Sequence, residues 1–136
     1  MADLTDLSTA RPTRQPNCHL ILPRGWGTGP AHQDSPVFPV EAPVLARAVA
    51  DLLAKTPRTE IVARGPDGLQ VEAEERSRLF GFVDRISVRA VPQGAGSSAL
   101  AFFSRSRIGY WDLGVNRKRA HRLLAALESE SATARP

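Results

Sequence analysis

Hydrophobic and polar residues alternate through much of the second half of the chain, as they do in β-strands with one buried face. Residues 69–74, 80–91 and 99–108 each follow this two-residue period. Glycine-rich turns precede the first of these segments and join the last two, the second turn being Gln-Gly-Ala-Gly at 93–96. Short turns between consecutive strands predict an antiparallel sheet.

Two other segments repeat apolar residues at the three- and four-residue spacing of an amphipathic helix. Residues 42–55 predict the first helix, with Pro43 in the first turn, where its missing amide costs nothing. The second helix follows a corner near Gly109, and Asp112 is a plausible N-cap for it.

With further strands at 37–40 and 59–64, the predicted order is β-α-β-β-β-β-α. We therefore expect one α+β domain over residues 18–128, with both helices on one face of the antiparallel sheet. This order resembles the TATA-binding-protein-like or small helix-grip arrangement, a likeness of fold that implies no function. The polar ends, residues 1–17 and 129–136, are expected to be flexible tails.

Asp84 interrupts the apolar face of its strand, between Phe82 and Ile86. Because side chains opposite each other in an antiparallel pair share a face, Asp84 should face Ser104 or Ser106. A carboxylate on a buried face needs hydrogen bonds or a cation. We predict a polar seam between the sheet and the second helix. It either pins the helix or lines a small-ligand pocket, and its members are Asp84, Ser104, Ser106, Tyr110 and Asn116.

The opposite face of the sheet is expected to be charged, with arginines beside Glu72 and Glu74. These side chains form either cross-strand ion pairs or a surface for an anion or protein partner. Nucleic acid is disfavoured as the partner because Phe103 is the only aromatic residue on that face. Four cations of the second helix are expected on a solvated face that could dock an acidic protein, namely Arg117, Lys118, Arg119 and Arg122. The complete predicted surface is Arg85, Arg89, Arg105, Arg107, Arg117, Lys118 and Arg119.

Two long runs carry a family resemblance. SRSRIGYWDLGVNRKR, residues 104–119, is similar to the signature of domain-of-unknown-function family 1499, small bacterial and plastid proteins. RSRLFGFVDRISVR, residues 76–89, resembles the family's second block, and PNCHLILP, residues 16–23, resembles its start. The resemblance covers residues 16–128 and implies no established activity.

The chain of 136 residues has a net charge of +4 and a single cysteine, Cys18. The single cysteine excludes an internal disulfide. The first residues contain no apolar run that could serve as a signal peptide, and nothing is apolar enough to span a membrane. We therefore expect a small soluble protein in the cytoplasm.

Catalytic and metal-binding motifs are not recognised. The glycines at 25, 27 and 29 do not precede a helix, so they do not match a phosphate-binding loop. His19, His32 and His121 are far apart in the sequence and are expected in separate loop or surface roles. The leading hypothesis is a non-enzymatic binding or interaction module, without a cofactor or metal. The alternatives are a protein that binds a small anionic or amphipathic ligand between the sheet and the second helix, and a hydrolase-like enzyme that uses Asp84.

Overall fold

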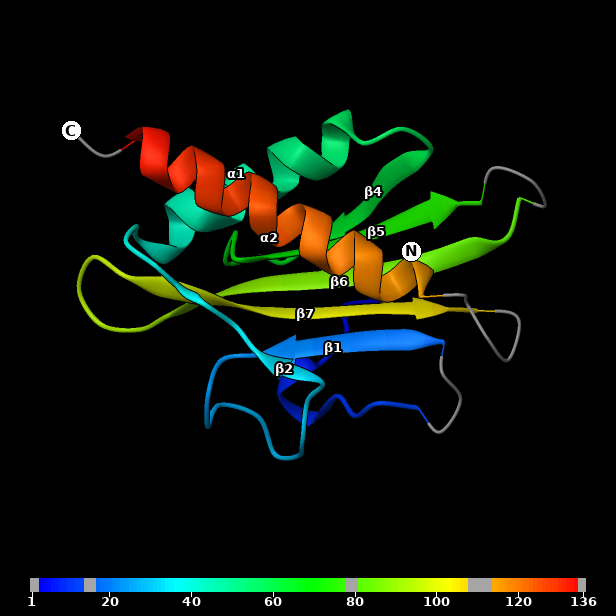
Figure 1. Ribbon diagram of the computed structural model, residues 1–136, viewed down its shortest axis with the longest axis horizontal. Coiled ribbons are helices and arrows are strands. Elements are labelled where there is room, and N and C mark those ends of the chain that lie inside the picture. The colour runs from blue at the N-terminus through cyan, green and yellow to red at the C-terminus, as the bar shows by residue number, and fades with distance from the viewer. Residues whose placement is uncertain (1–2, 14–16, 78–80, 108–113, 135–136) are drawn as a thin grey trace.

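The computed structural model describes residues 3–13, 17–77, 81–107 and 114–134, with side chains of the last segment up to Glu130. It contains a mostly antiparallel sheet and two helices (Figure 1). The elements are η1 (Leu7–Thr9), β1 (Cys18–Leu22), β2 (Gln33–Asp34), β3 (Val37–Phe38), α1 (Ala42–Lys55), β4 (Thr59–Arg64), β5 (Gln70–Arg76), β6 (Val83–Pro92), β7 (Ser98–Ser106) and α2 (Val115–Ala134).

The sheet has the strand order β2-β1-β7-β6-β5-β4, and β3 pairs separately with β7. The pairs from β4 to β7 are antiparallel, as is β1 with β7, whereas β1 and β2 are parallel, so the sheet is mixed. The prediction of a purely antiparallel sheet is therefore wrong at this edge. The strand expected at 37–40 is only two residues long and pairs with the beginning of β7, whereas β1 pairs with residues 102–105 of β7.

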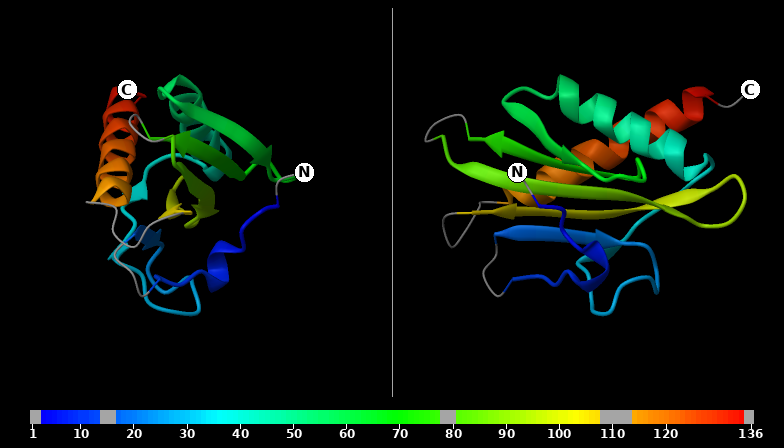
Figure 2. Two further views of the ribbon diagram at one scale, coloured as in Figure 1. Left: turned by 90° about the vertical axis from the view of Figure 1, so that its right-hand side faces the viewer. Right: turned by 180° about the vertical axis from the view of Figure 1, so that it is seen from behind.

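Helix α1 and strand β4 have the bounds that the sequence pattern predicted, 42–55 and 59–64. Leu45, Val49 and Leu53 of α1 are buried, as their spacing required. Both helices pack on one face of the sheet, on a core formed by the alternate residues of β5, β6 and β7 (Figure 2). Strand β6 begins at Val83, and Phe82, which we expected to point inward, is 45% exposed.

The second face of the sheet is covered by the beginning of the chain, which lies on the side away from the helices (Figure 2). Leu7 is only 1% exposed and belongs to a second apolar cluster with Ala101 and Phe103 of β7. The loop after β1 adds Trp26, and the amide of Thr28 donates to the carbonyl of Ser8. Residues 3–10 thus contact the sheet, in place of the loose tail expected there. At the other end, α2 continues to Ala134, past the expected boundary at 128.

Candidate functional site

A network of charged and polar side chains lies between the sheet and the first half of α2, with Arg119 at its centre. The guanidinium donates Nε–H to Glu75 Oε1 at 3.1 Å, and its Nη2 donates to Glu75 Oε2 at 3.1 Å and to Asp84 Oδ2 at 3.0 Å. Its Nη1 donates to Ser104 Oγ at 2.8 Å and to Asn116 Oδ1 at 2.7 Å. All five N–H donors of the arginine therefore have an acceptor.

Asn116 completes this network and is fully buried. Its Oδ1 also accepts from Ser104 Oγ, and its Nδ2 donates to Ser106 Oγ at 3.1 Å and to the carbonyl of Asn17 at 2.9 Å. These bonds join α2 to β7 and to the residue that precedes β1. Because each buried polar group is paired, the network holds the helix on the sheet.

The structure brings together four of the five residues predicted for the seam. Asp84 lies directly opposite Ser106 in the pairing of β6 with β7, but among the described residues it hydrogen-bonds to Arg119 and to neither serine. Tyr110 falls outside the described residues, as does Asp112, the predicted N-cap.

Two residues of the network were missed in the sequence. Arg119 was placed on a solvated helix face, which is wrong, because it is only 6% exposed. Its position three residues after Asn116 could have indicated the same face of the helix. Glu75 lies opposite Asp84 in the sheet, and extending the alternation of residues 69–74 by one position would have turned it inward.

A cavity of about 290 Å³ lies next to this network, between the end of α1, the middle of α2 and the sheet. Two residues of the network, Glu75 and Arg119, also line this cavity. The cavity therefore lies beside the predicted seam, and the four seam residues that the structure describes are not among those that line it. The lining residues are Leu52, Leu53, Lys55, Thr56, Pro57, Glu75, Phe102, Arg119, Arg122, Leu123 and Ala126.

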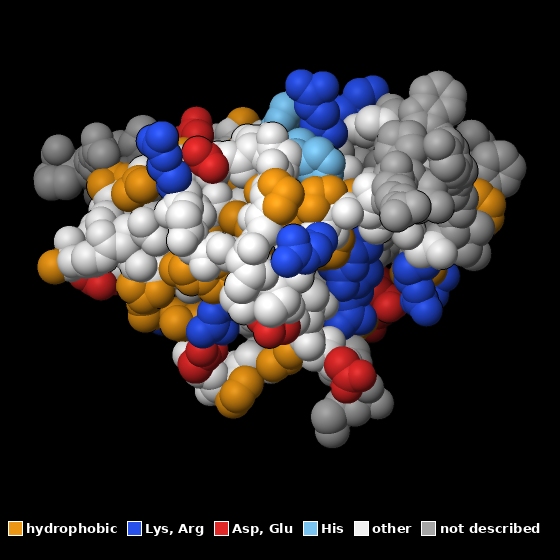
Figure 3. All heavy atoms as spheres, turned by 90° about the horizontal axis from the view of Figure 1, so that it is seen from below, with side chains coloured by type: hydrophobic (Ala, Val, Ile, Leu, Met, Phe, Trp, Pro, Cys, Tyr) orange, Lys and Arg blue, Asp and Glu red, His pale blue; other side chains and the backbone are white. Residues whose placement is uncertain are grey.

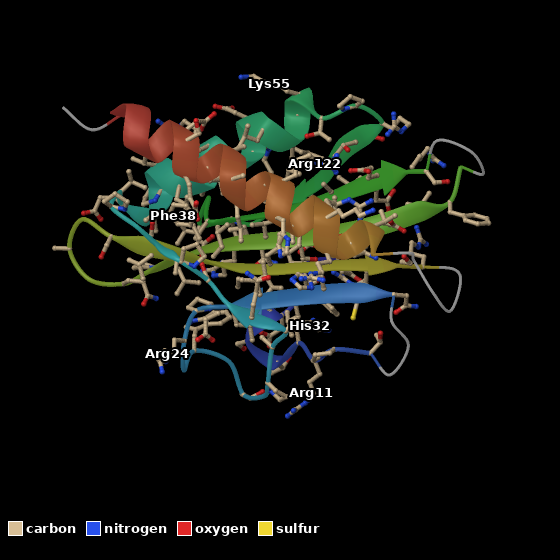
Figure 4. The ribbon with its side chains drawn as sticks, viewed as in Figure 1. Arg11, Arg24, His32, Phe38, Lys55 and Arg122 are labelled. Carbon is tan, nitrogen blue, oxygen red and sulfur yellow. The ribbon has the colours of Figure 1, made fainter. Side chains whose placement is uncertain are left out.

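The walls of the cavity are mainly apolar, and two of its lining cations are exposed to solvent. Lys55 at the end of α1 and Arg122 on α2 are these exposed cations (Figure 4). Arg119 and Glu75 lie deeper, with only 7% and 10% of their side chains exposed, and they bind each other. The cavity thus combines an apolar interior with a positively charged mouth.

On the second face of the sheet, most predicted anion-binding residues are in ion pairs. Arg89 Nη2 lies 2.6 Å from Asp67 Oδ2, and Arg107 Nη1 lies 3.4 Å from Glu74 Oε2. Arg85 Nε lies 2.9 Å from Oε1 of the fully buried Glu72. The last two predicted residues, Arg117 and Lys118, are exposed on α2.

Glu72 is also bound by the N-terminal segment. Burial favours a raised pKa for Glu72, but hydrogen bonds from Ser87 Oγ, the Thr5 amide, Gln70 Nε2 and Arg85 outweigh it and hold the pKa below its ordinary value. The remaining arginine of this face, Arg105, donates to Ser87 Oγ, Thr5 Oγ1 and the carbonyl of Phe103.

Three histidines that are distant in the sequence meet at the edge of the sheet, so the expectation of separate roles is wrong. His19 is only 6% exposed and stacks on His32 at 4.9 Å between ring centroids, with His121 edge-on at 5.8 Å. Figure 3 shows His side chains on the surface beside Lys and Arg side chains. Burial is the main cause that lowers the pKa of His19. The hydrogen bond with Gln33 raises this pKa, whereas the charges of His32, His121 and Arg117 lower it further.

Burial also lowers the pKa of His32, whose Nδ1 accepts the backbone amide of Leu20. In the part of the chain that the structure describes, no three His, Cys, Asp or Glu side chains are grouped to hold a metal ion. The backbone amide of Thr13 lies 3.4 Å from the sulfur of Cys18.

Neither described helix has the length and apolar composition that a membrane span requires.

Comparison with known proteins identifies one family. A model of proteins of unknown function, DUF1499, matches residues 8–127. No curated protein matches the chain.

Three solved structures share a general likeness in fold. The di-domain ARO/CYC protein BexL from the BE-7585A biosynthetic pathway is 15% identical with a TM-score of 0.47, and the match covers 70% of this chain and 44% of that one. TTHA0849 from Thermus thermophilus is 14% identical with a TM-score of 0.40, at 75% and 97% coverage. The Zhui aromatase/cyclase from Streptomyces sp. R1128 is 14% identical with a TM-score of 0.30, at 74% and 84% coverage. Similarities of this size identify neither a ligand nor an activity for this chain.

Proposed function

This chain belongs to the DUF1499 family of proteins of unknown function, and we propose that it binds a small amphipathic anion in the cavity between α1, α2 and the sheet, without catalysing a reaction. The observation that carries this proposal is the cavity itself. Its volume of about 290 Å³ is close to the lower end of the range for ligand pockets, roughly 300–1,000 Å³. The ligand is therefore small, of the size of an aromatic or short aliphatic acid.

The lining residues define how such a ligand would lie. Phe102, Leu123 and Ala126 offer apolar surface that a hydrocarbon group would cover, which releases water from both. The mouth carries the cations Lys55 and Arg122, which attract an anionic group.

The interior of the cavity disfavours a buried anionic group. All donors of Arg119 are already used by protein acceptors, and the carboxylate of Glu75 would repel a second negative charge. The apolar part of the ligand therefore points inward and its charged group stays at the mouth, against Lys55 and Arg122.

Asp84 has a positioning role in this proposal, rather than the catalytic role of the hydrolase alternative. Its Oδ2 accepts from Arg119 at 3.0 Å, and its side chain is only 14% exposed. A carboxylate that activates water must face the substrate. Asp84 is also not among the residues that line the cavity.

The proposal is tested by titrating the protein with 8-anilinonaphthalene-1-sulfonate, an amphipathic aromatic anion that fluoresces when it leaves water. Ala126→Trp fills the cavity and should abolish the saturable signal. Ala125→Trp is the matched control, because Ala125 is exposed on α2 and lies outside the cavity. Near-UV circular dichroism verifies that both variants are folded.

A second pair of variants tests the charged mouth. The double variant Lys55→Gln, Arg122→Gln should weaken probe binding by about tenfold, the effect of losing two exposed charged contacts of somewhat less than about 1 kcal/mol each. Lys118→Gln removes a charge of the same sign from an exposed position of α2 outside the cavity and should change little. Equal probe affinity in Ala126→Trp and Ala125→Trp would refute the cavity as the site.

A further inference from the structure

A second site lies on the opposite face of the sheet, where an open depression of about 400 Å³ separates the N-terminal segment from β5, β6 and β7. Its residues come from strands whose side chains alternate to this face and from the first residues of the chain. In Figure 3, Lys and Arg side chains lie next to acidic side chains on this side of the molecule. The lining residues are Asp3, Leu4, Thr5, Glu74, Arg85, Arg105 and Arg107.

We propose that this depression binds a phosphate-class oxyanion through Arg105, with Arg107 and Arg85 beside it. The argument begins with the balance of charge. In the register of the sheet Arg85 lies directly opposite Arg105, so two like charges are neighbours. Like charges directly across a sheet are unfavourable unless a negative charge is placed between them or beside them.

Arg85 has such partners at ion-pair distance, whereas, among the described residues, the charge of Glu72 acts on Arg105 only from beyond that distance. Arg85 Nε lies 2.9 Å from Glu72 Oε1, and its Nη1 lies 3.8 Å from Glu74 Oε2. Among the described residues no carboxylate lies within 4.0 Å of the Arg105 guanidinium, which donates only to neutral oxygens. Arg105 is half-buried, and a charge withdrawn from water is normally paired, so an anion is the ion-pair partner that this arginine lacks.

The surroundings of Arg105 support the same conclusion. The ring of Phe103 lies 4.6 Å below its guanidinium, which holds the planar group in one orientation. Burial lowers the pKa of Arg105, opposed by the charge of Glu72. Arg107, whose side chain is 58% exposed, has Glu74 at 3.4 Å as its ion-pair partner among the described residues. Its remaining donors are available to an oxyanion with several oxygens.

An acidic residue, Asp3, also lines the depression beside the three arginines. Asp3 is exposed, and its backbone carbonyl accepts from Arg85 Nη2 at 2.7 Å. A negative side chain at the mouth opposes anion binding. Asp3→Asn should therefore tighten the binding of phosphate.

Isothermal titration with inorganic phosphate at constant ionic strength tests the proposal, and acetate serves as the planar carboxylate for comparison. Arg107→Gln should weaken phosphate binding by about tenfold, and Asp3→Asn should strengthen it. Arg89→Gln is the matched control, because Arg89 lies on the same face of β6 but is bound to Asp67 and does not line the depression. Arg107 is exposed, so its replacement leaves the fold intact even if Arg105→Gln unfolds the protein.

A phosphate affinity that is the same in Arg107→Gln and Arg89→Gln would overturn the proposal, as would the absence of saturable phosphate heat in the wild type. Binding of acetate as tight as that of phosphate would overturn the assignment to phosphate-class anions. The site does not share a lining residue with the cavity under α2, so either proposal can fail without the other.

Discussion

Replacing Arg119 with methionine keeps the aliphatic length of the side chain but removes the cation that binds Glu75 and Asp84. Two carboxylates then face each other across β5 and β6 with their counter-charge gone, and the acceptors of Ser104 and Asn116 lose a donor. Removing one partner of a buried ion pair costs about 3–5 kcal/mol. The three charged side chains are 7–14% exposed, so solvent screening reduces this cost only slightly.

Urea denaturation followed by circular dichroism measures this loss at pH 7, with the slope of unfolding as a check that the same surface is exposed. Lys118→Met is the control on the same helix and should cost less than about 0.5 kcal/mol, since Lys118 is exposed. In a double-mutant cycle, Arg119→Met and Glu75→Gln should show a coupling energy of about 1–3 kcal/mol. A loss below about 1 kcal/mol for Arg119→Met would refute the reasoning that this network is buried and paired.

Three further predictions concern stability. Asp84→Ala should cost about 1–3 kcal/mol in urea denaturation, because it leaves an Arg119 donor unpaired, and an unchanged midpoint would contradict its burial. Leu7→Ala should cost about 2–5 kcal/mol, whereas Leu4→Ala, at an exposed position, should be nearly neutral; equal effects would show that the N-terminal segment does not belong to the folded unit. The pKa of His19 and of His32 is lowered from 6.5 by burial, so below that pH the unfolded chain binds more protons than the folded one. The stability that these histidines contribute is complete above pH 6.5 and is lost as the pH falls, and His19→Gln should reduce this slope; an unchanged slope between pH 7 and pH 5 would contradict it.

The local elements were predictable because their signals are local. The apolar stripe of 42–55 and the alternation of the later strands depend on residues close in sequence, and the apolar faces indicate which residues of neighbouring strands share a face. The same parity predicted Ser104 or Ser106 opposite Asp84, and the structure has Ser106 there.

Contacts between distant segments were not predictable in this way. Nothing near Thr5 indicates that its amide will bind Glu72, which lies 67 residues later. The meeting of His19, His32 and His121 likewise depends on the position of β1 at the edge of the sheet. Arg119 was misplaced because arginines on helices are commonly solvated, and only the two carboxylates opposite it provide the reason for burying it.

The cavity beside Arg119 depends on three-dimensional packing and has no pattern of its own in the sequence. It forms where α1 ends at Lys55 and α2 crosses the same face of the sheet. The resemblance to the family covered the residues around it without indicating a ligand.

Native mass spectrometry of the protein purified from its source cell tests the central claim most directly. The account predicts that wild type and Ala125→Trp retain a small organic anion, released on denaturation, and that Ala126→Trp does not retain it. Retention of the same mass by Ala126→Trp, or a wild-type spectrum that contains only the unliganded chain, would contradict the binding of a small anion between the two helices and the sheet.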